Sequence, residues 1–126
     1  MNAWLLVGGF GALGALARHL LDVGLRGRFG PGPSYGVLVA NLAGSALLGG
    51  IVGHATGHGL DRDVYLALAV GFCGAFTTFS TLMAEIVQLL EGEGEMHGAW
   101  PALAWALVSI VGGVGAAAIT FRLAGG

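Results

Sequence analysis

The chain has 126 residues, of which 56% are hydrophobic and only 10% are charged, and its formal net charge is −2. Charged residues make up about a quarter of an ordinary soluble domain, so this composition argues against that class and favours a bilayer as the solvent. The small net charge and the five scattered basic residues argue against a nucleic-acid-binding surface.

Four apolar segments follow one another along the chain, and each is long enough to cross a membrane. A membrane helix needs about 20 residues, so four spans with short loops occupy nearly the whole length. The expected spans are residues 3–21, 35–54, 64–90 and 100–123. The sequence therefore predicts an all-α membrane protein with one four-helix transmembrane domain over residues 1–126.

The first segment has an alternative interpretation, because Ala15-Leu16-Ala17 resembles a signal-peptide cleavage site. No basic residue precedes the apolar run, which favours a retained span. Arg18 lies near the end of this span, where its side chain can reach the membrane surface or concentrate anions at a vestibule. The turn-rich residues 22–34 should form a polar loop.

The second segment combines a small-residue face with one amide. Gly49, Gly53 and Gly57 recur every fourth residue, a spacing that lets two helix backbones approach closely. Asn41 lies within the span, where an unpaired amide is costly, so it needs a partner. That partner is either another helix or a permeating anion to which the NH₂ group donates. Residues 54–63 should form a loop.

The third segment contains a stretch of glycine and hydroxyl residues at 71–81. Gly71 and Gly74 weaken the helical hydrogen-bond ladder, and β-branched Thr77 and Thr78 add little helix propensity. Irregular backbone inside a membrane survives only where it is buried in protein or lines a cavity or ion site. The sequence therefore predicts that the third helix is broken at its centre and that an ion pathway is built around the break.

Side chains in the same stretch have both a structural and a functional interpretation. The hydroxyls can bond to helix carbonyls, or a subset of them can form a track of donors for an anion. Phe76 and Phe79, three residues apart, should share one helical face. Their rings either pack against lipid and helices or turn electropositive edges toward a pore. The hydroxyl residues are Thr77, Thr78, Ser80 and Thr81.

Other candidate residues carry weaker signals. Glu85 lies inside the third span, where an ionisable side chain suggests a function unless it reaches water at the end of the helix. Cys73 fits a small buried side chain better than a reactive thiol. His54 and His58 share a face only if the second helix extends, and two ligands are too few for zinc. No catalytic motif is present, so no enzyme is indicated.

The arginines give little preference for either orientation in the membrane. With a cytoplasmic N-terminus, Arg62 and Arg122 would lie on the cytoplasmic side and Arg26 and Arg28 on the other. The bias that normally fixes topology is nearly balanced. A chain without a preferred orientation can insert both ways and pair antiparallel, with a two-fold axis in the membrane plane.

The run Gly-Phe-Cys-Gly-x-Phe-Thr-Thr-Phe-Ser-Thr at 71–81 resembles the third transmembrane segment of the CrcB/Fluc family of small fluoride channels. The similarity covers nearly the full chain. It includes Gly11, Gly14, Ala15 and Arg18, then Gly36, residues 39–45 and Gly49, and the central stretch through Glu85.

The resemblance implies an architecture and a set of site residues. Members of that family are antiparallel dimers with two fluoride pores, and a structural sodium ion (Na⁺) lies on the dimer axis. By resemblance, the backbone carbonyls of Gly74 and Thr77 would hold the sodium. The residues that match the family's pore are Arg18, Asn41, Phe79, Ser80, Thr81 and Ser109.

Three positions depart from the family pattern. A second phenylalanine is replaced by Leu82, a tyrosine by Trp105 and a hydroxyl residue by Gly113. One explanation is that Phe76 or Trp105 supplies the missing aromatic edge of the pore. The other is that the chain is half of a heterodimer, with a paired homologous subunit completing one good pore.

The resemblance and the residues together predict a multi-pass protein of the cell membrane that conducts fluoride passively and lowers cytoplasmic fluoride. Its expected partner is a second, antiparallel copy. The main alternative is a proton-coupled small multidrug exporter, but that class needs a carboxylate in its first span and none precedes Asp22. A non-conducting membrane scaffold would leave Asn41 and the hydroxyl residues unexplained.

Overall fold

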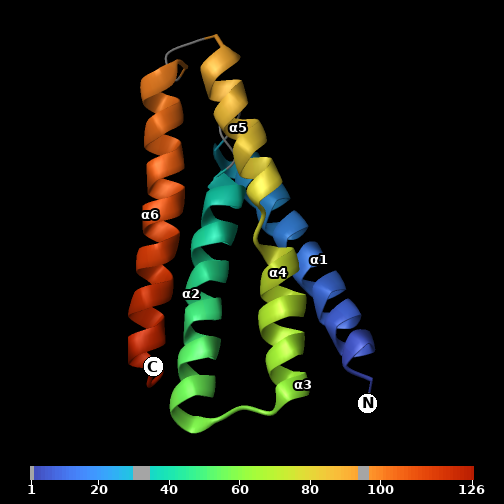
Figure 1. Cartoon of the computed structure of the whole chain (residues 1–126). Helices are drawn as coiled ribbons and strands as arrows, with labels where there is room; N and C mark the ends of the chain where they lie inside the picture. Colours follow the sequence, from blue (N-terminus) through green and yellow to red (C-terminus); the bar gives the residue numbers. More distant parts are fainter. Residues whose placement is uncertain (1, 30–34, 94–96) are drawn as a thin grey trace.

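The computed structural model describes residues 2–29, 35–93 and 97–126, and its regular elements in these ranges are helices. Four helical segments are long and apolar enough to cross a membrane, which confirms the prediction of an all-helical, four-span protein. Figure 1 shows them side by side, with both chain ends at the same end of the bundle. The segments are Ala3–Arg28, Tyr35–His58, Arg62–Glu91 and Ala99–Leu123.

Two helices are longer than the sequence predicted. Helix α1 spans Ala3–Phe29, so residues 22–29 are helical rather than part of a loop. The Asp22 carboxylate accepts from Arg26 Nε at 3.1 Å, an i,i+4 ion pair that supports the added turns. Helix α2 spans Tyr35–His58, four residues beyond the predicted end, and its last turns remain packed against the C-terminal part of the chain.

The third segment consists of several helical pieces. Helix α3 (Arg62–Tyr65) is capped at its N-terminus by Asp61, whose carboxylate accepts from the backbone N–H groups of Asp63 and Val64. The wider π-helix η1 (Leu66–Cys73) and the short helix α4 (Gly74–Phe76) follow. Helix α5 (Phe79–Glu91) completes the segment.

Between α4 and α5 the backbone of two residues is extended. Thr77 has φ −83° and ψ 157°, and Thr78 has φ −150° and ψ 126°. We call Thr77–Thr78 the extended pair. Gly71 and Gly74, which the sequence suggested as weak points, stay helical: Gly71 lies in the π-helix, and Gly74 has φ −60° and ψ −37°. The glycines therefore keep helical geometry, and two threonines leave it.

Helix α6 (Ala99–Leu123) packs chiefly against α2 along the predicted glycine face. A Cβ atom added to Gly49, Gly53 or Gly57 would collide with the backbone carbonyl of a residue in the C-terminal part of the chain. The prediction of close backbone packing at these glycines is therefore confirmed. The carbonyls concerned belong to Ala117, Phe121 and Gly125.

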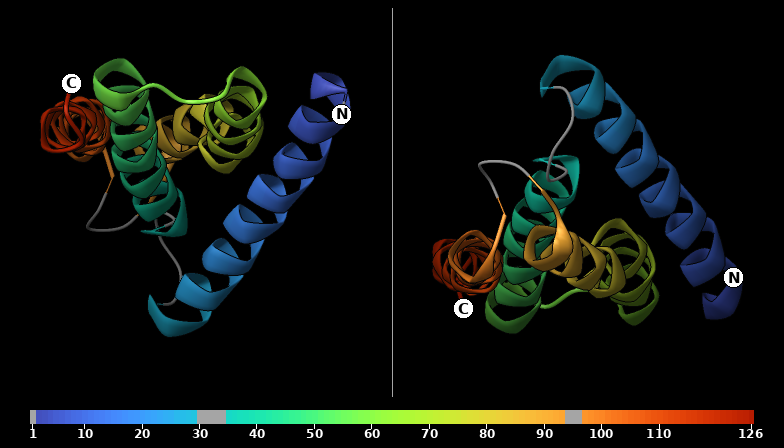
Figure 2. Two further views of the ribbon diagram at one scale, coloured as in Figure 1. Left: turned by 90° about the horizontal axis from the view of Figure 1, so that it is seen from below. Right: turned by 90° about the horizontal axis from the view of Figure 1, so that it is seen from above.

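Helix α1 packs mainly against η1 and crosses the other helices at an angle, as both views in Figure 2 show. This contact also depends on glycine, because an added Cβ on Gly14 would meet the Phe72 carbonyl and one on Gly71 would meet the Val7 carbonyl at 2.8 Å. Small residues thus allow close backbone contact both between α2 and α6 and between α1 and η1.

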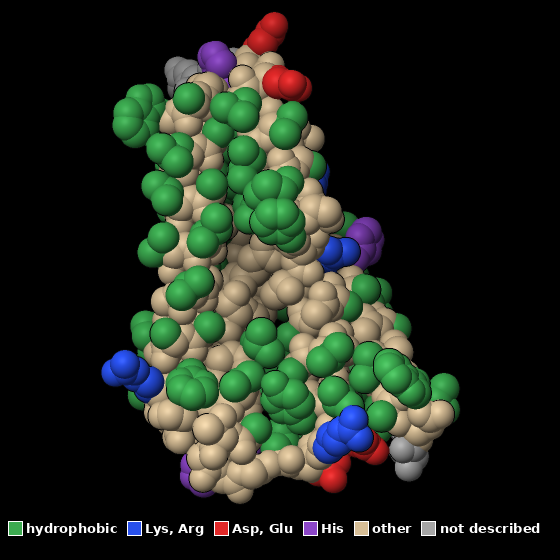
Figure 3. Space-filling model, in the orientation of Figure 1, with side chains coloured by type: hydrophobic (Ala, Val, Ile, Leu, Met, Phe, Trp, Pro, Cys, Tyr) green, Lys and Arg blue, Asp and Glu red, His purple; other side chains and the backbone are tan. Residues whose placement is uncertain are grey.

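The surface is mostly apolar and the buried core is small. Figure 3 shows hydrophobic side chains along the length of the molecule, with acidic side chains at its two ends and basic side chains near the lower end and on both flanks. One buried cluster, formed by Leu82, Leu89, Ala102 and Trp105, joins α5 to α6. Such a surface fits a protein whose solvent is lipid.

Candidate ion pathway

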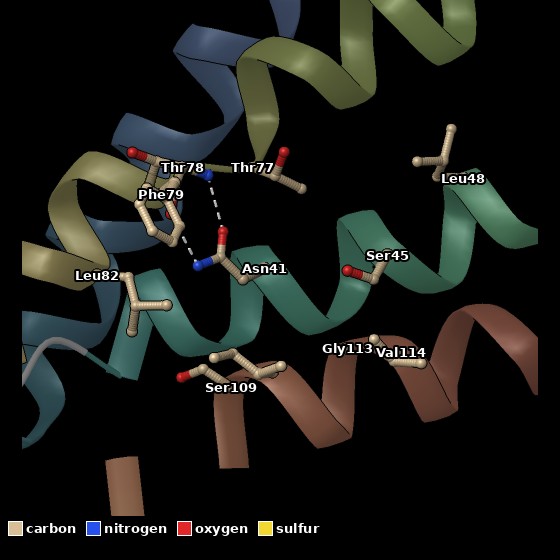
Figure 4. Close-up of a pocket in the computed structure, with 11 residues that line it drawn as sticks. Asn41, Ser45, Leu48, Thr77, Thr78, Phe79, Leu82, Ser109, Gly113 and Val114 are labelled. Carbon is tan, nitrogen blue, oxygen red and sulfur yellow. Dashed lines mark hydrogen bonds between the residues drawn. The ribbon is translucent and has the colours of Figure 1, made fainter. Parts of the chain in front are cut away.

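The side-chain amide of Asn41 binds the backbone of Thr78 (Figure 4). Asn41 Nδ2 donates to the Thr78 carbonyl at 3.0 Å, and the Thr78 N–H donates to Asn41 Oδ1 at 2.8 Å. Asn41 is part of α2, so these bonds connect α2 to the extended pair. The structure therefore gives Asn41 an interhelical partner, one of the two roles that the sequence left open.

This pairing leaves two backbone carbonyls without their usual helical donors. In an unbroken helix the N–H of Thr78 would bond to the carbonyl of Gly74, but here it bonds to Asn41. The N–H of Thr81, the helical donor for the Thr77 carbonyl, instead bonds to Thr78 Oγ1 at 3.4 Å. The carbonyls of Gly74 and Thr77 are thus available as oxygen ligands.

A groove of about 290 Å³ lies between α2, the extended pair, the start of α5 and the middle of α6. Its walls combine apolar side chains with an amide and several hydroxyls, and none of its lining residues is charged. Figure 4 shows how these side chains converge from different helices. The lining residues are Asn41, Ser45, Leu48, Thr77, Thr78, Phe79, Leu82, Ser109, Ile110, Gly113 and Val114.

Ser109 stands out in this groove. Its side chain is buried, with 6% of the residue exposed, and its Oγ has no hydrogen-bond partner among the described residues. A hydroxyl in a helix normally satisfies itself by bonding to a carbonyl of the preceding turn, as Thr120 does with Ala116. An unpaired buried hydroxyl at a groove wall is therefore available to a ligand.

Hydroxyls also cluster at the N-terminus of α5. Thr78 Oγ1 donates to Thr81 Oγ1 at 3.2 Å and lies 3.4 Å from Ser80 Oγ. The first turn of a helix carries partial positive charge, which favours an anion. The predicted hydroxyl residues Ser80 and Thr81 are thus placed together beside the groove.

A second, smaller cavity of about 130 Å³ adjoins Thr81 of this hydroxyl cluster. Arg18 lines it together with Thr81, so the predicted arginine and one predicted hydroxyl residue share a cavity. The Asp22 carboxylate in the same cavity is paired with Arg26. The remaining lining residues are His19 and Val37.

The two candidate phenylalanines do not share a helical face, contrary to the sequence prediction. The extended pair separates them, so Phe76 belongs to α4 and Phe79 to α5. The Phe76 ring stacks on Phe72, with centroids 5.5 Å apart and planes at 18°. Phe79 is 69% exposed and lines the groove. Phe79 therefore belongs to the groove, whereas Phe76 packs within the third segment.

Glu85 does not reach water, although it lies toward the end of the third span. It is 5% exposed, and its Oε2 accepts a 3.0 Å hydrogen bond from Trp105 Nε1. Trp105 is also buried, and the one N–H group of its side chain is used in this bond. The structure thus gives Trp105 a structural partner on α5, and Trp105 is not among the residues that line the groove. Sequence reasoning missed this pair.

The other departures from the family pattern, Leu82 and Gly113, both line the groove. A Cβ atom on Gly113 would lie 3.2 Å from Ser45 Oγ, so a larger residue would have to displace that side chain. Leu82 is buried. These two departures from the family pattern therefore lie in the wall of the groove, whereas the third, Trp105, is not among the residues that line it.

The remaining candidates lie away from the groove. Cys73 is buried and free. The longer α2 places His54 and His58 on one face, and their rings stack with centroids 5.0 Å apart. Within the described ranges no three His, Cys, Asp or Glu side chains form a group that could hold a metal ion.

Comparison with known proteins finds relatives that are named as ion channels. A protein from Moorella thermoacetica named fluoride-specific ion channel FluC 2 is 44% identical over 89% of this chain and 88% of its own length. Proteins with related fluoride-channel names from Cutibacterium acnes and Gloeobacter violaceus are each 39% identical, over 82% and 84% of this chain and 85% and 82% of their own lengths. These names denote ion channels and not enzymes.

The family described as "CrcB-like protein, Camphor Resistance (CrcB)" matches residues 5–121. That range contains all the groove residues, both cavities and the extended pair. The chain therefore belongs to the CrcB-like protein family.

Proposed function

We propose that this chain forms a fluoride-specific ion channel of the cell membrane, which passes fluoride down its gradient and so lowers cytoplasmic fluoride. Its family and the names of its relatives support this function. The observation that carries the proposal is the buried, unpaired hydroxyl of Ser109 in the same groove as Asn41.

The chemistry of the groove suits a small, strongly hydrated anion. Such an ion enters a narrow pore only if protein donors replace its water. The groove offers the Asn41 amide and several hydroxyls without any charged side chain that would trap the ion. The exposed ring of Phe79 adds an electropositive edge.

The path of the ion follows the order of the polar groups. From the groove, fluoride passes the hydroxyls of Ser80 and Thr81 at the N-terminus of α5 and reaches the cavity of Arg18. Arg18 raises the local anion concentration there, while the pairing of Asp22 with Arg26 reduces the opposing negative charge. Phe76 supports this path by packing rather than by lining the groove.

The channel is a dimer of two antiparallel copies, inserted in both orientations. Two features of the single chain support this arrangement. Phe79 is exposed beside the groove, and Gly74 is exposed with nothing within 4 Å of an added Cβ, so both are free to face another protein surface. The balanced arginines leave neither orientation preferred.

The extended pair is the functional break of the third transmembrane helix, and backbone carbonyls at this break would hold a structural sodium ion. The carbonyls of Gly74 and Thr77 have lost their helical donors, and freed carbonyls at broken helices coordinate Na⁺ in secondary transporters. With both copies contributing, the ion would offset the cost of burying these dipoles in lipid.

Halide efflux from liposomes that contain only this polypeptide tests the proposal. Fluoride should leave fluoride-loaded liposomes once a potassium ionophore compensates the charge, without any pH gradient, and chloride should stay inside. Absence of fluoride efflux would contradict a channel made of this chain alone. Efflux that depends on a proton gradient would favour the proton-coupled exporter instead.

A further inference from the structure

We propose that the buried hydrogen bond between Trp105 and Glu85 sets the width of the groove and thereby excludes halides larger than fluoride. This inference rests on the proposed channel function. It assigns the two residues a positioning role, because neither lines the groove itself.

The bond lies one helical turn from the groove on both helices that it joins. On α5, Leu82 lines the groove and precedes Glu85 by three residues; on α6, Ser109 lines it and follows Trp105 by four residues. Trp105 Nε1 donates to Glu85 Oε2 at 3.0 Å, so the bond fixes the separation of these two walls.

Trp105 also contacts α2, the helix that forms the third wall of the groove. The ring of Tyr35, at the start of α2, meets the indole edge to face, with centroids 5.6 Å apart and planes at 79°. One buried side chain therefore touches α2, α5 and α6, the three helices that line the groove. A rigid indole in this place holds all three at a fixed spacing.

The attachment of α5 makes this contact especially important. Helix α5 packs mainly against α6; it is connected to α2 through the extended pair and through Leu38, which packs on the cluster between α5 and α6. The interface with α6 is a small buried cluster around Trp105 and Leu82. Loss of the bond would remove one donor from a buried carboxylate and one connection between α5 and α6, so α5 would be free to shift relative to α6.

A wider groove should alter selectivity before it alters conduction. Fluoride needs close donors, but its donors at Asn41 and Ser109 belong to α2 and α6, which remain packed through their glycine face. Chloride is excluded by size, so a shift of α5 admits it. The expected signature is a rise in chloride flux with fluoride flux retained.

Three substitutions separate the bond from the charge and from the packing. Trp105→Phe keeps a ring for Tyr35 but removes the N–H, and Glu85→Met keeps the length of the side chain but removes the acceptor. Glu85→Gln removes the charge and keeps a carbonyl oxygen for the indole. Trp100→Phe is the matched control, because Trp100 lies on the same helix and is 81% exposed.

The experiment measures fluoride and chloride efflux from liposomes for each variant. A variant is tested only if it elutes from a size-exclusion column at the same volume as the unmodified protein, which shows that it is folded. Trp105→Phe and Glu85→Met should each raise chloride efflux relative to fluoride efflux by about tenfold, which corresponds to about 1.4 kcal/mol. Glu85→Gln and Trp100→Phe should stay within about twofold. A variant that combines Trp105→Phe with Glu85→Met should match either of these substitutions alone, because each removes the same bond.

Several outcomes would overturn the inference. If Trp105→Phe excludes chloride as well as the unmodified protein does, the bond does not determine selectivity. Leakage in Glu85→Gln equal to that in Glu85→Met would assign the effect to charge. If Trp105→Phe does not fold, the comparison of Glu85→Met with Glu85→Gln decides the matter. An unmodified protein that passes no fluoride overturns the proposed function itself, whereas a fluoride-selective protein with silent variants overturns only this inference.

Discussion

Asn41 and Thr78 exchange two hydrogen bonds across 37 residues of sequence, from the Thr78 N–H to Asn41 Oδ1 and from Asn41 Nδ2 to the Thr78 carbonyl. The amide thus binds both backbone polar groups of Thr78. This pairing stabilises the extended pair, draws the Thr78 N–H away from the Gly74 carbonyl, and leaves the second N–H of the Asn41 amide near the groove.

Truncation of this amide should harm both stability and conduction. Asn41→Ala leaves the N–H and the carbonyl of Thr78 without their partner, at a cost of about 2 kcal/mol or more in the free energy of unfolding. Fluoride efflux should fall to the level of empty liposomes. Thermal unfolding in detergent and liposome efflux measure the two effects.

Gln88→Ala is the control, because it truncates an exposed amide on α5. It should change neither the unfolding temperature nor efflux. Asn41→Ala liposomes that release fluoride as fast as the unmodified protein would refute the assignment of Asn41 to the pore.

Ser109→Ala should separate function from folding. The Ser109 hydroxyl has no partner among the described residues, so its removal takes away no internal hydrogen bond and should leave the unfolding temperature unchanged. If fluoride uses this hydroxyl, efflux should fall about tenfold, the loss expected when a donor worth about 1.4 kcal/mol is removed.

Thr56→Val serves as the matched hydroxyl deletion. Thr56 Oγ1 donates to the Val52 carbonyl at the exposed end of α2, outside the groove. This variant should conduct normally. Unchanged efflux from Ser109→Ala would show that the buried hydroxyl is not a ligand of the ion.

Methyl groups on the glycine face of α2 should destabilise the protein. In Gly49→Ala and Gly53→Ala the new Cβ meets the carbonyls of Ala117 and Phe121, and the helices must separate. Overpacking of this kind costs about 1 to 3 kcal/mol. Gly50→Ala adds a methyl group whose nearest neighbour is Thr120 Cβ at 3.9 Å, so this variant should be at least as stable as the unmodified protein.

The apparent unfolding temperature in detergent, followed by circular dichroism, gives the comparison. Equal temperatures for Gly49→Ala and Gly50→Ala would contradict the observed packing of α2 against α6.

A cysteine at position 74 should report the proposed two-fold axis. In a Cys73→Ala background, Gly74→Cys places one thiol where the two copies are proposed to meet, and oxidation should produce a covalent dimer on a non-reducing gel. A disulfide requires Cα atoms within about 7 Å, so the reaction is a stringent measure of proximity. The yield of the covalent dimer should be higher in a sodium buffer than in a choline buffer.

Gly8→Cys is the corresponding control on α1, another glycine with nothing within 4 Å of an added Cβ. It should remain monomeric under the same oxidation. Equal cross-linking at both positions would indicate random collision, and no cross-linking at position 74 would place the dimer axis elsewhere.

The sequence was a poor guide where the outcome depended on distant neighbours. Low helix propensity marked Gly71, Gly74, Thr77 and Thr78 alike as weak points, yet both glycines stay helical and the two threonines are extended. Local propensity cannot reveal that Asn41 takes the N–H of Thr78. Likewise, the position of Glu85 near the end of its span suggested access to water, because its donor Trp105 lies on another helix.

The sequence by itself determined the four membrane-spanning segments and the family, because apolar length and a long local motif are properties of consecutive residues. It also determined the close contact of α2, since a glycine at every fourth position allows backbones to touch whichever helix supplies the other side. Only the tertiary structure decided which polar groups in the bundle are satisfied. In a bundle surrounded by lipid a polar side chain can be satisfied only by protein groups that packing brings near, and packing brings Thr78 to Asn41 and Trp105 to Glu85 but leaves the Ser109 hydroxyl without a partner among the described residues.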